Sequence, residues 1–256
     1  MQKTKETSVA DRKEDQQGNG VVDALFSVGA HFGFVKSRRH PSAKAFIFGA
    51  KNKIEIFDLE KTSLELAKAL TFVEAKGKEG VMGLFVGGKA EAREAVVKTG
   101  KELEMPYVHG RWIGGTLTNF PEIKKRIARL EELTGQREKG ELSKYTKKER
   151  LLIDREIDKL IVYFGGLHTL KGLPKFLVVI DPKKEHIAVS EAHKMHIPVV
   201  ALAGSDSNLY DIEHAIPGND ASRQSIAYIL GEVTAAYKKG KEAREKELAN
   251  QEEAKV

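Results

Sequence analysis

Hydrophobic and polar positions along the chain follow two different rhythms. Short apolar runs without clean alternation, typical of strands covered on both faces, are separated by longer stretches with apolar residues at helical spacing. The expected strands are residues 54–57, 81–86, 106–109, 176–180 and 198–203, with 46–48 as a hairpin partner of the first. The expected helices are residues 59–76, 89–104, 185–195 and 221–237. This order predicts an α/β fold with a Rossmann- or flavodoxin-like parallel sheet flanked by helices.

Residues 121–164 break that rhythm, because two long helical patterns follow one another without a strand between them. Their apolar residues form narrow seams with charges all round, at Ile123, Ile127, Leu130 and Leu133, and at Ile153, Ile157, Leu160 and Phe164. Narrow seams predict an inserted antiparallel coiled-coil hairpin. Its expected tip is residues 134–145, which contain Gly135 and Gly140. Such an arm is either a docking device or a structural brace.

The chain of 256 residues therefore divides into four expected parts. Residues 1–20 are expected to form a disordered N-terminal extension, and residues 238–256 a charged tail that is disordered or a fraying helix. Residues 21–120 and 165–237 form the expected α/β body, and residues 121–164 form the hairpin. The first 20 residues lack the apolar stretch of a signal peptide. No later apolar run approaches membrane-spanning length, so no membrane partner is expected.

The amino-acid composition excludes some kinds of site and favours one kind of partner. The absence of cysteine excludes disulfides, thiolate metal sites and Cys nucleophiles, and suits a reducing compartment, with the cytosol as the default. A net charge of +6 and a pI near 9.2 favour an anionic partner. Because 31% of the residues are charged, however, most charges are expected to form an ordinary solvated surface.

No set of residues predicts catalysis or a bound metal. Residues 83–90 (GLFVGGKA) resemble a phosphate-binding loop, but Ala90 stands where a hydroxyl must hold magnesium, and Gly83 falls inside a predicted strand. The histidines form no metal-binding signature, and Ser205 lies in no nucleophile elbow. No cofactor is expected. The alternative from this class is a nucleotide- or sugar-phosphate-binding enzyme that uses the Gly87–Gly88 turn and Asp181 at neighbouring strand ends.

A nucleic-acid partner is better supported. Residues 24–54 contain no acidic residue, while the cations Lys36, Arg38, Arg39, Lys44, Lys51 and Lys53 interleave with His31, Phe32, Phe34 and His40. Cations neutralise phosphates and aromatic faces stack on bases. RNA is favoured over DNA because no DNA-binding motif is present. The alternative is a basic, solvated loop around a buried aromatic pair.

The segment RWIGGTLTNF, residues 111–120, is the second candidate recognition element. Arg111 and Trp112 can grip a phosphate or stack on a base, and Thr116 and Asn119 can hydrogen-bond to RNA. The alternative is a Gly-rich turn with a half-buried Trp before a helix that Thr116 or Thr118 caps.

Several longer motifs occur together: GAHFG (29–33), IEIFDLEKT (54–62), RWIGGTLTNF (111–120), GLP (172–174), DPKKEHIAV (181–189) and IPGND (216–220). In this order they resemble the bacterial ribosomal protein S2 family. The resemblance implies a Rossmann-like body with a coiled-coil arm and no enzymatic activity. It implies a structural constituent of the cytoplasmic small ribosomal subunit that binds small-subunit rRNA and neighbouring proteins, with ribosomal protein S1 among them in many bacteria.

By this resemblance and the local chemistry, the expected RNA contacts are His31, Lys36, Arg38, Arg39, Lys44, Arg111, Trp112, Thr116 and Asn119. Two positions depart from the family pattern. Phe34 stands where the family commonly has a second His, and His40 where it commonly has Asn. A polar RNA contact is therefore not expected at either position.

Overall fold

A five-stranded parallel sheet forms the centre of the chain in the computed structural model, which describes residues 20–253. Its strands are β4 (Gly83–Val86), β5 (Tyr107–Val108), β6 (Phe176–Ile180), β7 (Val199–Ala203) and β8 (His214–Pro217), in the order β5-β4-β6-β7-β8. This is the flavodoxin-like order, in which the chain first turns to one side of β4 and then to the other. The predicted α/β class with a parallel sheet is confirmed, and the sheet's switch point lies between β4 and β6.

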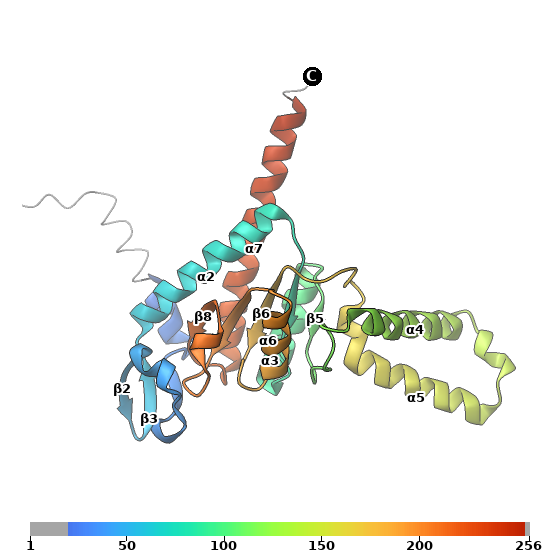
Figure 1. Ribbon diagram of the computed structural model, residues 1–256, viewed down its shortest axis with the longest axis horizontal. Helices are drawn as coiled ribbons and strands as arrows, with labels where there is room; N and C mark the ends of the chain where they lie inside the picture. The colour runs from blue at the N-terminus through green and yellow to red at the C-terminus, as the bar shows by residue number, and fades with distance from the viewer. Residues whose placement is uncertain (1–19, 254–256) are drawn as a thin grey trace, which may run out of the picture.

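Helices cover both faces of this sheet, because alternate strand residues point in opposite directions. Phe85 and Val178 face a core built with α2 (Leu59–Glu79), α3 (Ala90–Glu102) and α7 (Arg223–Glu253). Val86 and Val179 face a second core with α6 (His186–Lys194) and the base of the arm. Figure 1 shows this layered arrangement, with the arm extending to one side.

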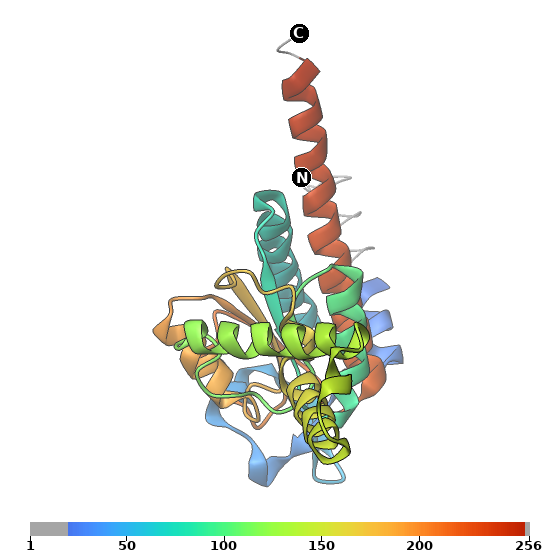
Figure 2. The same ribbon diagram turned by 90° about the vertical axis from the view of Figure 1, so that its right-hand side faces the viewer.

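Two glycines allow α2 and α7 to lie almost backbone to backbone. A Cβ at Gly77 would collide with the carbonyl of Tyr237, and one at Gly240 would collide with the carbonyl of Glu74. Helix α7 does not stop near residue 237 but continues to Glu253 and projects beyond α2 (Figure 2). The expected N-terminal extension falls almost wholly on residues 1–19, which lie outside the described residues, as do 254–256.

A second, antiparallel sheet lies apart from the main one. It contains β1 (Phe32–Val35), β2 (Ile47–Lys51) and β3 (Ile54–Phe57) in the order β1-β3-β2. The predicted pairing of residues 46–48 with 54–57 is confirmed, although these strands do not join the parallel sheet. The short 3-10 helices η1 (Lys36–Arg38) and η2 (Pro41–Phe46) connect β1 to β2. We call residues 31–57 the basic lobe.

Strands β1 and β8 were not among the predicted elements. Strand β1 has the sequence FGFV, in which glycine interrupts the apolar run, and β8 has the sequence HAIP, which is too short and mixed to stand out. Pairing with a neighbouring strand therefore decides both conformations.

The arm consists of α4 (Phe120–Glu138), the 3-10 helix η3 (Glu141–Lys144) and α5 (Lys147–Phe164), and the 3-10 helix η4 (Gly165–Leu167) leads back to the body. Its helices pack through the predicted seam, including Ile127, Leu130 and Ile157. Thr146 and Glu149 cap α5 reciprocally, which fixes the turn at the arm's end. The predicted helical pair is confirmed. Helix α4 begins after Asn119, so neither Thr116 nor Thr118 is its N-cap.

Candidate nucleic-acid interface

The basic lobe presents a group of cations that the protein itself does not neutralise. Their side chains are exposed and form no ion pair with any residue in the described range 20–253; they are Lys36, Arg38, Lys44, Lys51 and Lys53. Asn52 and Lys53 have φ angles of 52° and 67°, as in the tight turns that join twisted antiparallel strands. This turn holds Lys51 and Lys53 at the tip of the β2–β3 hairpin. The lobe thus carries positive charge that an anionic partner can neutralise.

Arg39 differs from its neighbour Arg38. Its Nη1 lies 3.0 Å from Oε1 of Glu55, whose side chain is 1% exposed. Because an isolated carboxylate is costly to bury, this pair holds the lobe together. Arg39 is therefore a structural partner within the lobe, whereas Arg38 is free to contact a ligand.

Aromatic rings lie in and beside the lobe. His31 stacks on Phe26 with centroids 4.6 Å apart and lies 4.0 Å from the ring of Phe32. Burial lowers the pKa of His31, which favours the neutral imidazole. Phe26 and Phe32 are partly exposed, and Phe48 on β2 is 82% exposed. Ring faces and cations therefore share this lobe, as the sequence predicted.

The segment 111–120 is organised around a carboxylate that the sequence analysis did not single out. The buried Glu191 on α6 accepts hydrogen bonds from Trp112 Nε1 (3.2 Å) and from the backbone N–H groups of Gly115 (2.7 Å) and Leu117 (2.9 Å). The backbone N–H and hydroxyl of Thr118 also donate to it, each at 3.2 Å. Burial opposes ionisation, but these hydrogen bonds outweigh it and lower the pKa of Glu191.

This arrangement places the expected contact residues of the segment in different environments. Trp112 is 4% exposed and packs in the core, and Thr116 is buried with its hydroxyl donating to the carbonyl of Ile113 at 2.6 Å. Arg111 and Asn119 are exposed. The only signal for Glu191 was its position among the apolar residues Ala188, Val189 and Ala192 of α6, where an acidic residue is unexpected.

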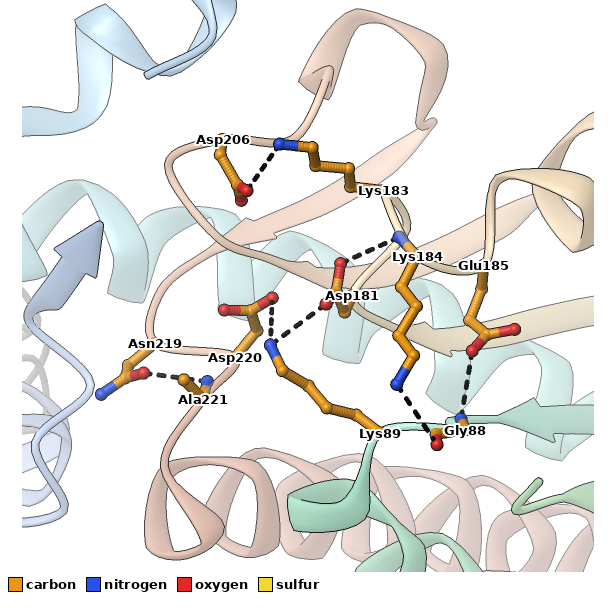
Figure 3. A network of polar contacts seen from close by, with 10 residues as sticks. All are labelled: Gly88, Lys89, Asp181, Lys183, Lys184, Glu185, Asp206, Asn219, Asp220 and Ala221. Carbon is orange, nitrogen blue, oxygen red and sulfur yellow. Dashed lines mark hydrogen bonds and ion pairs between the residues drawn. The ribbon is translucent and has the colours of Figure 1, made fainter. Parts of the chain in front are cut away.

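A second internal network lies at the carboxyl ends of β4, β6 and β8 (Figure 3). Lys89 Nζ lies 3.1 Å from Asp181 Oδ2 and 3.2 Å from Asp220 Oδ2. Asp181 adopts the left-handed region, with φ at 63°, and its Oδ1 accepts a hydrogen bond from the backbone of Lys184 at 3.1 Å. Lys89 Nζ also lies 5.6 Å from the ring centroid of Phe34, which connects this network to the basic lobe.

Asp220 is the most deeply placed group of this network, with its side chain 1% exposed. Burial raises its pKa to about 6, with the attraction of Lys89 opposing that rise and the nearby Asp181 adding to it. For Lys89, burial opposes the charged form, but the two carboxylates outweigh it and raise the lysine's pKa. The lysine that corresponds to a phosphate-binding loop is thus neutralised within the protein. Residues 83–90 therefore lack the free lysine that a phosphate-binding loop requires.

Comparison of the sequence with models of known protein families gives a match over most of the chain. The model of the family described as "Ribosomal protein S2" matches residues 25–240, which include the basic lobe, the arm and the body. The chain belongs to the ribosomal protein S2 family. It is 42% identical over 229 residues to the small ribosomal subunit protein uS2 of Nitratiruptor sp., covering 90% of this chain and 86% of that protein. It is 40% identical to the uS2 protein of Dictyoglomus thermophilum, covering 89% of this chain and 92% of that protein.

Membership of the S2 family establishes the protein's general role in the cell. The protein is a structural constituent of the small ribosomal subunit, acts in translation and is not an enzyme. As a small-subunit ribosomal protein it partners with rRNA and other ribosomal proteins. None of the helices within residues 20–253 is long and apolar enough to span a membrane.

Proposed function

We propose that the basic lobe is the principal rRNA-contacting surface of this S2 family member. The observation that carries this proposal is the group of exposed cations without internal partners: Lys36, Arg38, Lys44, Lys51 and Lys53. Phosphate neutralisation supplies most of the affinity in such interfaces. The exposed rings of Phe32 and Phe48 lie on the same small sheet and offer stacking faces for unpaired bases.

In this proposal the other expected contact residues have two kinds of role. Arg111 and Asn119 remain candidates for direct contact, because both are exposed. Arg39, Trp112 and Thr116 act through internal contacts that hold the interface in shape. His31 is partly exposed and supports the aromatic side of the lobe.

The arm is proposed as a docking surface for neighbouring ribosomal proteins. Helix α5 exposes Leu151, Leu152, Ile161 and Val162, which the pairing with α4 leaves uncovered. Exposed apolar side chains grouped on a projecting element favour a protein partner over RNA. We include ribosomal protein S1 among the proposed protein partners because the sequence motifs resemble those of a family that binds it in many bacteria.

Charge removal in the lobe tests the RNA interface. A variant with Lys36→Gln, Arg38→Gln and Lys44→Gln should bind small-subunit rRNA with a log–log salt slope shallower by roughly 2 to 3, since each lost phosphate contact removes about 0.7–0.9. The matched control removes equal charge from the exposed arm residues Lys124, Arg126 and Lys148. Equal slopes for the lobe variant and the wild type would exclude the lobe as the main phosphate contact.

A further inference from the structure

A separate cavity of about 350 Å³ opens at the switch point of the parallel sheet. Its lining includes Gly88 after β4, Gly110 after β5, and Lys184 and Glu185 after β6, together with Arg93 on α3 and Arg111. Crevices at this position, outside the carboxyl ends of the strands, are where doubly wound sheets bind ligands. The fold alone does not imply a ligand, so the side chains that line the cavity must show whether it binds one.

The lining is rich in cations that have no carboxylate partner. Arg93, Arg111 and Lys184 form no ion pair within the described part of the chain. The ammonium group of Lys184 donates a long hydrogen bond to the backbone oxygen of Gly88, at 3.5 Å. All three side chains are exposed, and no carboxylate within residues 20–253 lies within ion-pair distance of them to supply a counter-charge. An anion from outside the protein would supply it.

The one carboxylate of the lining, Glu185, forms no ion pair with these cations within residues 20–253. Glu185 is buried, and its Oε1 accepts a hydrogen bond from the backbone N–H of Gly88 at 3.2 Å (Figure 3). Burial raises the pKa of Glu185, while the hydrogen bond from Gly88 and the positive charge of Lys184 oppose that rise. Asp181, at the end of β6, is engaged by Lys89. Burial, and then the charge of Arg93, lower the pKa of the nearby His109, which favours its neutral form.

Backbone geometry adds to the positive character of the cavity. Gly88 lies two residues before α3 and Glu185 immediately before α6, and neither helix has a side-chain cap at its N-terminus. The positive ends of two helix dipoles therefore lie beside the same cavity. A side chain at position 88 would collide with the carbonyl of Gly110, so only glycine permits this close approach of the strand ends.

We propose that this cavity, the strand-end pocket, binds a phosphate group. A guanidinium can donate two parallel hydrogen bonds to a phosphate, which suits Arg93 and Arg111, and Lys184 adds a point charge. The volume is at the lower end of the range for small-ligand sites and has room for a phosphate with its attached sugar. That group comes from the RNA backbone or from a free nucleotide. The RNA form of the proposal rests on the rRNA-binding function proposed above.

The test uses the full chain with Arg93→Gln. Lys98→Gln is the matched control, because Lys98 is exposed on the same helix and lies outside the pocket lining. The first arm measures the thermal midpoint with adenosine monophosphate, or with inorganic phosphate, against chloride at constant ionic strength. The second arm measures the salt dependence of small-subunit rRNA binding.

If the pocket takes a backbone phosphate, Arg93→Gln alone lowers the magnitude of the rRNA salt slope by about 0.7–0.9. If it takes a free nucleotide, the wild type and Lys98→Gln are stabilised by adenosine monophosphate, Arg93→Gln is not, and rRNA binding is unchanged. The proposal is overturned if Arg93→Gln behaves like Lys98→Gln in both arms. Failure of the wild type to bind rRNA would instead remove the proposed RNA function, and the nucleotide arm would then decide the pocket by itself.

Discussion

The segment 111–120 and the basic lobe both carry the residue types of an RNA-binding site, yet the protein uses them in opposite ways. In the segment, the donors of Trp112, Gly115, Leu117 and Thr118 converge on the buried carboxylate of Glu191. In the lobe, only Arg39 has an internal acidic partner, and cations such as Lys36 and Arg38 have none within residues 20–253. We therefore expect the RNA contacts where charged groups remain without an internal partner after folding.

The same distinction separates the ion-pair network around Lys89 from the neighbouring strand-end pocket. Lys89 is held between Asp181 and Asp220, so its charge is already neutralised. Arg93 lies in the first turn of α3, about one helical turn after Lys89, and lines a cavity without an ion-pair partner in residues 20–253. Internal ion pairs stabilise the crevice, and the cations left over are the candidates for external anions.

The largest effect is expected at Glu191. Glu191→Gln places an amide N–H among N–H and O–H donors and removes the charge that holds the segment 111–120. It should lower the free energy of unfolding by about 2–4 kcal/mol, because charge-assisted hydrogen bonds are lost and buried donors are left unpaired. Chemical denaturation measures this loss. Glu94→Gln, an exposed substitution on α3, is the control, and an equally small effect for both variants would contradict the anchoring role.

Asp220 should make stability depend on pH. Its pKa is raised from 3.8 to about 6, so the folded state binds this proton more tightly than the unfolded state. The resulting stability is fully present below about pH 4 and is lost as the pH rises through about 6. Asp220→Asn should flatten this part of the stability curve by up to about 3 kcal/mol.

The measurement is the free energy of unfolding at several pH values between about 4 and 7, with the exposed Asp158→Asn as control. Other shifted groups stay in both variants, so their contributions cancel in the comparison: Glu185, whose pKa burial raises, and His31, His109 and His214, whose pKa values burial lowers. A curve for Asp220→Asn that runs parallel to the wild-type curve would show that Asp220 is not the group responsible.

A smaller effect should separate the adjacent residues Arg38 and Arg39. Arg39→Gln leaves Glu55 buried without its ionic partner and should cost about 1–2 kcal/mol of stability, since Arg39 is itself partly solvated. Arg38→Gln should leave stability within about 0.5 kcal/mol and weaken rRNA binding instead. Denaturation and filter binding on both variants measure the contrast. A reversed pattern would mean that the internal and external roles are assigned to the wrong arginines.

The sequence sufficed for the parallel sheet, the arm and the basic character of the lobe, because each depends on a local pattern. Apolar runs such as residues 176–180 and the seam through Ile127 and Ile157 are visible without any knowledge of distant contacts. Strand β8 was missed because the sequence HAIP becomes a strand only through pairing with β7.

The internal polar networks could not be predicted in the same way. Glu191 meets Trp112, 79 residues away, and Asp220 meets Lys89, 131 residues away. These partners are set by which loops the parallel sheet brings together at its carboxyl edge. The sequence therefore identified Trp112 and Thr116 as notable residues and predicted that they contact RNA. In the fold, both side chains are buried and form hydrogen bonds inside the protein. Their proposed part in RNA recognition is to shape the surface that Arg111 and Asn119 share.

The measurement that tests the central claim most directly is lysine modification, read by mass spectrometry on the free chain and on the chain assembled into small ribosomal subunits. The account predicts that Lys36, Lys44, Lys51 and Lys53 react readily in the free chain and become protected in the subunit. Lys89, held by Asp181 and Asp220, should react slowly in both states. Equal reactivity of the lobe lysines in the free and assembled chain would contradict the account.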